Sequence, residues 1–251
     1  MFICLLKNDN TPQIMIKFFR KIRQNLLTEN KFGKYLLYAI GEIILVVIGI
    51  LIALQLNNLN ENNKNEVFEM EILSQIQENL KSDRLVLKKV EMNFSNAITS
   101  SNKILKAEVS QKTEDSIKIW LGAIIQFDRF QPLTNAYEML KSNGLDRISN
   151  KQLRFLLGRY YDDEAIRMIK STNDIEIAFN DHWIPILFEE TVEFEFKNLV
   201  ELKDYTVLLK PSKERNILKL NRDNYASGMY TIKGGIALIE EIQNLITKEV
   251  K

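Results

Sequence analysis

The stretch LLYAIGEIILVVIGILIALQL, residues 36–56, decides the fold of this chain. Its only charged side chain is that of Glu42. At about 1.5 Å per residue a helix of this length measures about 31 Å, which matches the hydrocarbon core of a bilayer. The run is too long for the apolar part of a signal peptide, and no pair of small residues at its end suits cleavage. We therefore predict a single transmembrane helix that acts as an uncleaved signal anchor.

The charges on the two sides of this span predict its orientation. Lysine and arginine dominate the preceding segment, residues 15–35, whereas glutamate dominates the residues that follow, up to about position 71. Short basic segments stay on the cytoplasmic side of a membrane. We expect the amino end inside the cell and everything beyond the span outside it.

The basic segment also has a helical pattern of its own. MIKFFRKIRQNLL, residues 15–27, places apolar side chains on one helical face and cations on the other, as in helices that lie in the membrane interface. A cluster that only sets topology would have the same pattern. The candidate contacts to lipid headgroups are Lys17, Arg20, Lys21 and Arg23. Residues 1–14 fit this pattern poorly, so we interpret them as an upstream extension and leave open whether Met1 or Met15 is the true start.

One face of the span combines an acid with small residues. Intervals of three and four residues place Ala39, Glu42, Val46, Gly49 and Ala53 on one helical stripe, of which Ala39, Glu42, Gly49 and Ala53 are the candidate contact residues. Small residues let helices approach closely, and a carboxylate about 9 Å inside the apolar run costs on the order of 2–3 kcal/mol unless it is satisfied. Three interpretations remain open: Glu42 reaches back to the headgroups, it contacts a second copy or another membrane protein, or it lies on a proton or ion path.

The rest of the chain is predicted to be helical. Residues 57–65 form a polar juncture, and 66–251 form one domain outside the membrane. Apolar spacing predicts a long helix over 66–107, interrupted by Asp83 and Ser101, and further helices capped by Thr113, by Thr134, by Ser149 or Asn150, and by Ser212. The third of these is expected to end near Trp183, before Pro185.

The predicted fold class is all-α, a single transmembrane helix followed by an antiparallel helical bundle. VEFEF, residues 192–196, alternates like a strand, but one isolated strand is not stable, so we expect a loop or a distorted turn there. One core should contain the following apolar residues: Leu80, Leu87, Val90, Leu157, Phe179, Ile232, Ile239 and Ile246.

No residue pattern indicates catalysis. The single histidine, His182, is predicted to be a packed core residue, the acids at 162–164 a solvated helix face, and Gly234-Gly235 a site of close helix packing. We expect no catalytic residue, no cofactor and no metal site. The net charge of +1 gives no reason to expect nucleic acid as a partner, and the single cysteine, Cys4, excludes an intramolecular disulfide. The expected partners are membrane lipid and either a second copy or another membrane protein.

Two blocks of sequence resemble a known family. Residues 15–58, from MIKFFRKIRQNLL through YAIGEIILVVIGILIALQLNN, resemble the opening of a large family of uncharacterised single-pass membrane proteins of Gram-negative bacteria. PLTNAYEMLKSNGLDRISNKQLRFLLGRYYD, residues 132–162, is similar to its middle segment. The resemblance implies an inner-membrane protein with a helical periplasmic part, and it adds no catalytic residue. We predict a non-enzymatic, membrane-anchored interaction or scaffold protein, with a ligand-sensing ectodomain as the alternative.

Overall fold

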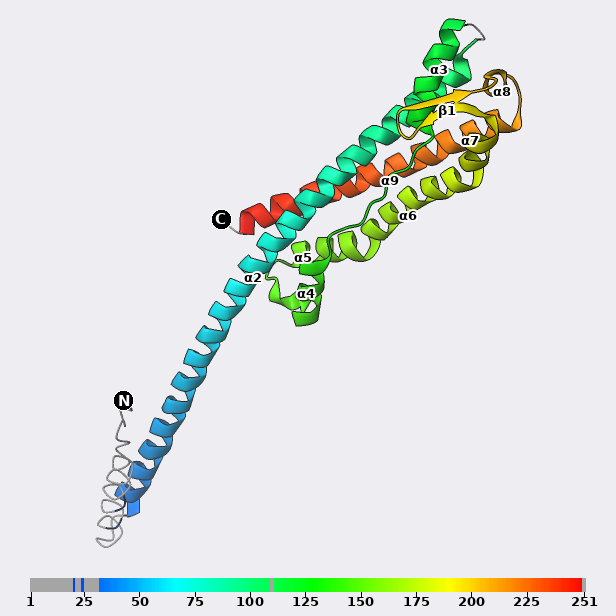
Figure 1. Ribbon diagram of the computed structural model, residues 1–251. Coiled ribbons are helices and arrows are strands. Elements are labelled where there is room, and N and C mark those ends of the chain that lie inside the picture. The colour runs from blue at the N-terminus through cyan, green and yellow to red at the C-terminus, as the bar shows by residue number, and fades with distance from the viewer. Residues whose placement is uncertain (1–19, 21–23, 25–31, 109–110, 250–251) are drawn as a thin grey trace, which may run out of the picture. The chain divides into compact units, whose positions relative to one another are not determined.

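The computed structural model describes residues 20, 24, 32–108 and 111–249 (Figure 1). The chain divides into two compact units, residues 1–64 and 65–251. Helix α2, Phe32–Lys106, is continuous through the polar residues 57–65. Among the described residues it is also the one helix long and apolar enough to cross a membrane, and its apolar part begins at Leu36.

The unit 65–251 is built almost entirely of helices, which confirms the all-α prediction. After α2 the elements follow in this order: α3 (Gln111–Ile124), α4 (Asn135–Asn143), η1 (Leu145–Arg147), α5 (Lys151–Arg159), η2 (Tyr160–Glu164), α6 (Ala165–Ala178), η3 (Phe179–Trp183), α7 (Ile184–Glu190), β1 (Thr191–Glu195), β2 (Leu199–Leu202), α8 (Thr206–Leu209) and α9 (Lys213–Glu249). The turns η2 and η3 are π-helical, so they interrupt an otherwise continuous helical path from Lys151 to Glu190.

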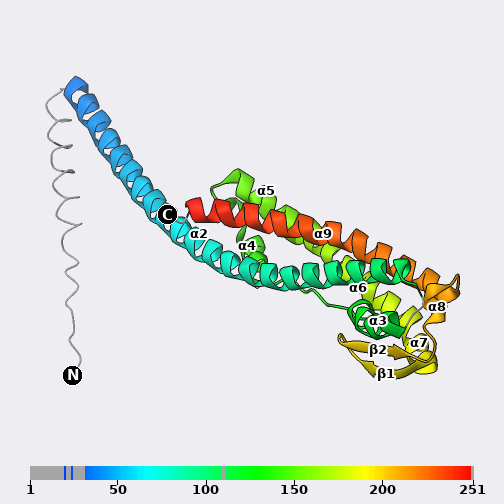
Figure 2. The ribbon, with the colours of Figure 1, turned by 90° about the horizontal axis from the view of Figure 1, so that it is seen from above.

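Helices α2, α6 and α9 form the bundle and lie side by side (Figures 1 and 2). The guanidinium of Arg215, near the start of α9, donates to the carbonyl of Leu105, near the end of α2, at 2.8 Å. Farther along, Arg84 of α2 lies 3.6 Å from Glu240 of α9. These pairs fix an antiparallel register between the two helices. Gly235 of α9 lets α6 approach closely, because a Cβ there would lie 2.1 Å from the sulfur of Met168. This confirms the predicted close packing at Gly235, whereas Gly234 is exposed.

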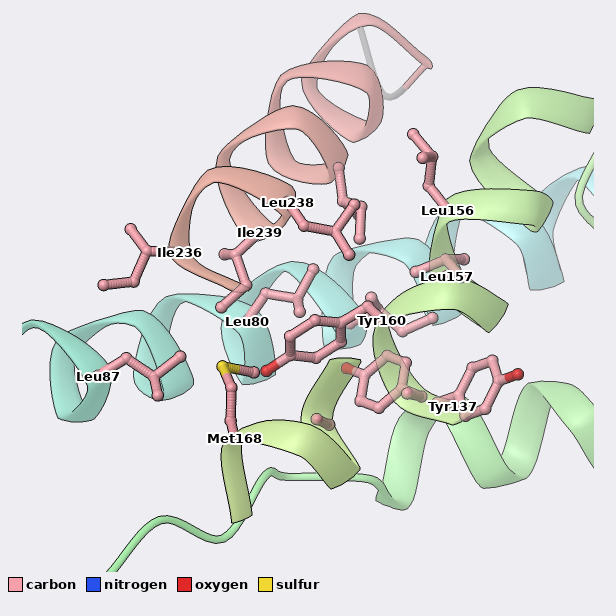
Figure 3. Close-up of a cluster of buried hydrophobic side chains, with 14 of the residues drawn as sticks. Leu80, Leu87, Tyr137, Leu156, Leu157, Tyr160, Met168, Ile236, Leu238 and Ile239 are labelled. Atoms are coloured by element: carbon pink, nitrogen blue, oxygen red, sulfur yellow. The ribbon is translucent and has the colours of Figure 1, made fainter. Parts of the chain in front are cut away.

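The apolar side chains form two clusters instead of the single core that was predicted. The larger cluster joins α2, α4, α5, α6 and α9, and it contains seven of the eight predicted core residues. In Figure 3 the ring of Tyr160 lies among Leu80 of α2, Leu157 of α5 and Ile239 of α9. The eighth residue, Phe179, belongs to a second cluster made by the end of α2, α3, η3, α7, β2, α8 and the start of α9. The spacing of apolar residues along a helix identifies its buried face, but it does not identify the neighbouring element that covers this face.

A two-stranded hairpin replaces the loop that was expected around VEFEF. β1 pairs antiparallel with β2, with Phe194 opposite Val200 and Glu195 opposite Leu199. Val200 and Leu202 are buried in the second cluster, where β2 packs on α3. The strand is therefore stable because its partner is anchored in a core, and the two strands lie together with α3 at the end of the unit away from the end of α9 (Figure 2).

Helix ends agree with the sequence at some positions and differ at others. Asn150 caps α5 by accepting from the amide of Leu153 at 3.0 Å, and Ser212 caps α9 by accepting from the amide of Arg215 at 2.9 Å. Thr134 precedes α4 without a side-chain cap. The prediction that Thr113 caps a helix was wrong, because α3 already begins at Gln111.

The helical path also continues past Trp183, where an end was predicted. Pro185 lies in the first turn of α7, a position where proline is tolerated. The π-turn η3 directly before it resets the hydrogen-bonding pattern, so the proline neither ends nor breaks the path.

Candidate functional site

The residues predicted to make a transmembrane contact lie in the unit 1–64. Ala39, Glu42, Gly49 and Ala53 all fall within α2, whose helical geometry confines them to one stripe. Gly49 and Ala53 are exposed, and apart from the neighbouring backbone of α2 itself nothing lies within 4 Å of a Cβ built on Gly49. In the single chain this stripe is therefore open at Gly49, and the contact itself stays a prediction.

Of the predicted headgroup contacts, the structure describes one. Arg20 is helical and exposed. Lys17, Lys21 and Arg23 lie outside the described residues. The interfacial role of this segment therefore stays a prediction.

A buried acid links three elements of the larger cluster. The Asp83 carboxylate on α2 is only 2% exposed, accepts from the Tyr160 hydroxyl at 2.7 Å, and accepts from the Leu133 amide at 3.1 Å. Burial raises the pKa of Asp83, while the two hydrogen bonds oppose that change. Burial and the nearby acid also raise the pKa of Tyr160, so its hydroxyl keeps its proton. This contact fixes the π-turn η2 against α2.

A second tyrosine pair extends this network toward solvent. The Tyr137 hydroxyl donates to Asp162 at 2.7 Å, and Lys141 donates to the other carboxylate oxygen at 2.9 Å. Partial burial raises the pKa of Asp162, but the hydrogen bonds from Tyr137 and Lys141 outweigh it and lower the pKa overall. The rings of Tyr137 and Tyr161 stack with centroids 4.4 Å apart. Asp162 is therefore engaged in this network, and the prediction of a simply solvated acidic face was incomplete.

The exposed apolar side chains around β1 form a surface that we call the hairpin patch. It consists of Phe188 at the end of α7, Val192 and Phe194 on β1, and Phe196 in the turn. Phe188 is 82% exposed and Val192 is 68% exposed. Soluble domains seldom expose large apolar side chains in a contiguous group unless the group binds something. The hairpin patch is therefore a candidate interaction surface.

One edge of β1 is free within the described residues, because the sheet contains only β1 and β2. The register places Glu193 opposite Glu201 and Glu195 opposite Leu199, so both β1 acids lie on the face away from Val200. Glu193 and Glu195 are both exposed on β1, while Lys118 of α3 lies 3.2 Å from Glu201 on β2. The free edge thus combines unpaired backbone groups, acids on one face and apolar side chains on the other.

A groove lies between α9 and the helical path through η2. Its volume is about 510 Å³, and its lining includes the cations of Arg159, Arg167 and Lys233 and one carboxylate, Glu164. Arg167 pairs with Asp163 at 3.1 Å. The groove is therefore mainly cationic, whereas the exposed charges of β1 are acidic.

Two further sequence predictions concern His182 and metal binding. His182 is half-buried in the π-turn η3, so it is not the fully buried core residue that the sequence predicted. Within the described ranges no group of His, Cys, Asp and Glu side chains is arranged to hold a metal ion.

Sequence reasoning missed the hairpin patch and the groove. The alternation of VEFEF was a signal for the patch. No local signal marks the groove, since its residues come from segments about 70 positions apart.

Comparison with protein families found one match. The family described as "Family of unknown function (DUF6090)" matches residues 42–211, which is more than half of the chain and includes the hairpin. Neither the curated proteins nor the solved structures contain a significant match.

Proposed function

This chain belongs to DUF6090, a family of unknown function, and we propose that it is a membrane-anchored, non-enzymatic interaction module whose helical domain binds a partner protein through β1. The free edge of β1 beside the hairpin patch is the observation that carries this proposal. The apolar part of α2 provides the anchor. With the basic segment 15–35 inside, residues 57–251 would lie in the periplasm and the anchor in the inner membrane.

The charges on β1 favour one kind of occupant of this edge over another. A second copy pairing through its own β1 would bring Glu193 and Glu195 against the same acids, and like charges across a strand pair are destabilising. A strand that alternates cations with apolar residues would instead place its cations beside the acids of β1 and its apolar side chains beside the apolar face. We therefore assign the edge to an extended segment of another protein, with lysine or arginine alternating with apolar side chains.

Peptide binding tests this assignment directly. The full-length protein in neutral detergent is titrated into a fluorescent peptide of alternating lysine and valine, and anisotropy gives the Kd. Two peptides serve as comparisons: one of alternating glutamate and valine, and the chain's own TVEFE sequence. We expect the lysine peptide to bind at least about tenfold more tightly than either, a difference of about 1.4 kcal/mol.

A charge reversal shows where the peptide binds. Glu193→Lys should weaken binding of the lysine peptide up to about fivefold, the size of one cross-strand charge pair. Glu138→Lys, on the exposed face of α4, is the matched control and should leave the Kd unchanged. Equal loss in both variants, or stronger binding of TVEFE than of the lysine peptide, would rule out the proposed occupant.

A ligand-sensing ectodomain is the second candidate function. The groove between η2 and α9 favours it, since its volume of about 510 Å³ lies in the range of small-molecule sites.

A further inference from the structure

We propose that the groove between η2 and α9 binds a small organic anion, a flat aromatic ring that carries one phosphate or carboxylate. This inference is independent of partner binding at β1, because the groove and the hairpin patch share no residue.

The charges of the groove select an anion. Three cations and one carboxylate line it. Arg159 has no ion-pair or hydrogen-bond partner among the described residues, whereas Lys233 has only a distant one, Glu91 at 4.0 Å. Arginine presents a planar set of donors that matches the oxygens of phosphate and carboxylate. Arg159 and Lys233 are therefore the groups available to a ligand, while Arg167 is held by Asp163.

The ring requirement comes from Tyr230. It is 85% exposed, more than any other large apolar or aromatic side chain described. It lies one helical turn before Gly234 on α9, so both face the groove. Gly234 has no side chain, so its backbone forms the floor of the groove between the Tyr230 ring and Glu164. A Cβ built on Gly234 would lie 3.4 Å from the Glu164 carboxylate. A flat ring can stack on Tyr230 over this bare backbone while its anionic group reaches Arg159 and Lys233.

The opposite wall is held in place from below. Arg159 directly precedes the π-turn η2, and Glu164 ends it. The bond from Tyr160 to the buried Asp83 fixes this turn against α2. π-Turns inside helices are frequent at functional sites. Here the turn sets the spacing between Arg159 and Glu164 without any flexible loop, so the groove is preformed.

Titration followed by phosphorus NMR tests the site. The probe is phenyl phosphate, added to the full-length protein in neutral detergent, with inorganic phosphate as the anion without a ring. We expect phenyl phosphate to bind about two- to tenfold more tightly than inorganic phosphate, since aromatic stacking contributes about 0.5–1.5 kcal/mol. Phenol should compete only weakly, because it lacks the anion.

Three variants separate the contributions. Arg159→Gln should weaken phenyl phosphate binding about tenfold, the size expected for a charge-assisted hydrogen bond. Tyr230→Ala should abolish the advantage over inorganic phosphate and leave the Kd of inorganic phosphate unchanged. Lys170→Gln, an exposed cation of α6 outside the groove lining, is the control and should change neither value.

Three results would overturn the inference. The first is no titration of phenyl phosphate. The second is an equal loss in Arg159→Gln and Lys170→Gln, which would indicate only nonspecific charge. The third is that the protein binds phosphatidylglycerol nanodiscs but not phosphatidylcholine nanodiscs, that this binding depends on Arg159, and that phenyl phosphate does not bind. That result would assign Arg159 and Lys233 to lipid headgroups.

Discussion

The hydroxyl of Tyr160 donates a 2.7 Å hydrogen bond to the carboxylate of Asp83, which lies 77 positions earlier in the chain. This bond joins the π-turn η2 to the middle of α2 inside the larger apolar cluster. A carboxylate that is 2% exposed would be costly without donors. The pair therefore stabilises the bundle and positions the wall of the groove.

Removing the hydroxyl of Tyr160 should destabilise the protein, because Asp83 loses a hydrogen-bond donor. Tyr160→Phe leaves Asp83 with the Leu133 amide as its remaining donor, and we expect the free energy of unfolding to fall by about 1–3 kcal/mol. Tyr230→Phe, which removes a hydroxyl from an exposed ring, should change it by less than about 0.5 kcal/mol. Denaturant titration of the full-length protein, followed by circular dichroism, measures both. Equal values for the two variants would mean that the buried bond contributes nothing.

The raised pKa of Asp83 makes the stability depend on pH in a defined direction. The folded state holds the Asp83 proton more tightly than the unfolded state, so this stabilising contribution is complete below the ordinary aspartate pKa of about 3.9 and is lost as pH rises through the folded pKa. The unfolding free energy of the wild type minus that of Asp83→Asn should therefore fall as pH increases across this window. A difference that rises with pH would mean that the hydrogen bonds outweigh burial.

Two glycines in helices should respond in opposite ways to alanine. A Cβ on Gly122 of α3 would lie 2.2 Å from the Asn198 carbonyl oxygen in the hairpin turn, so Gly122→Ala should destabilise the protein by about 1–3 kcal/mol. At Gly158 of α5 the nearest atom is the Tyr137 hydroxyl at 3.8 Å, and Gly158→Ala should stabilise by up to about 1 kcal/mol through helix propensity. Thermal melts of both variants provide the comparison.

The stripe on the apolar part of α2 predicts how substitutions change association in the membrane. If Glu42, Gly49 and Ala53 contact another helix, Gly49→Ile should abolish the signal by blocking close approach, and Glu42→Gln should weaken it modestly. A membrane two-hybrid assay between two copies, and cross-linking in detergent against other proteins, distinguish the partners. A wild-type signal from Gly49→Ile would mean that the stripe faces lipid.

Orientation can be measured with a reporter fused after Lys251. We expect alkaline phosphatase to be active there, because short basic segments such as residues 15–35 usually stay on the cytoplasmic side. A fluorescent reporter that folds only in the cytoplasm should stay dark at the same position. The reverse pair of results would place the helical domain, and with it the hairpin patch, inside the cell.

The sequence predicted the helices well because helical periodicity is local. The spacing of apolar residues identified the buried faces of α2, α5, α6 and α9, and Asn150 and Ser212 marked two of their starts. The hairpin was missed because β2 has only four residues, and its stability depends on Val200 and Leu202 packing on α3. Pairing of this kind is a tertiary property that alternation in one segment does not reveal.

Two polar residues interrupt the apolar pattern of α2 in the domain 65–251, and the partner of Asp83 could not be predicted from the sequence. Asp83 and Ser101 are both buried, so the apolar pattern was right about their positions. The partner of Asp83 lies in η2, and a π-turn has no sequence signature. The groove depends on that turn and on residues of α9, so neither its shape nor its charge could be read from any one segment.

Phe127 packs against both apolar clusters. Its partly buried ring joins the half of the domain that contains the hairpin to the half that contains the centres of α2 and α9. Proteins open in contiguous cooperative units that differ in stability. Amide hydrogens in β1, β2 and α3 should therefore exchange with solvent before those in the middle of the bundle, and a protein bound at β1 would slow exchange chiefly in its own half.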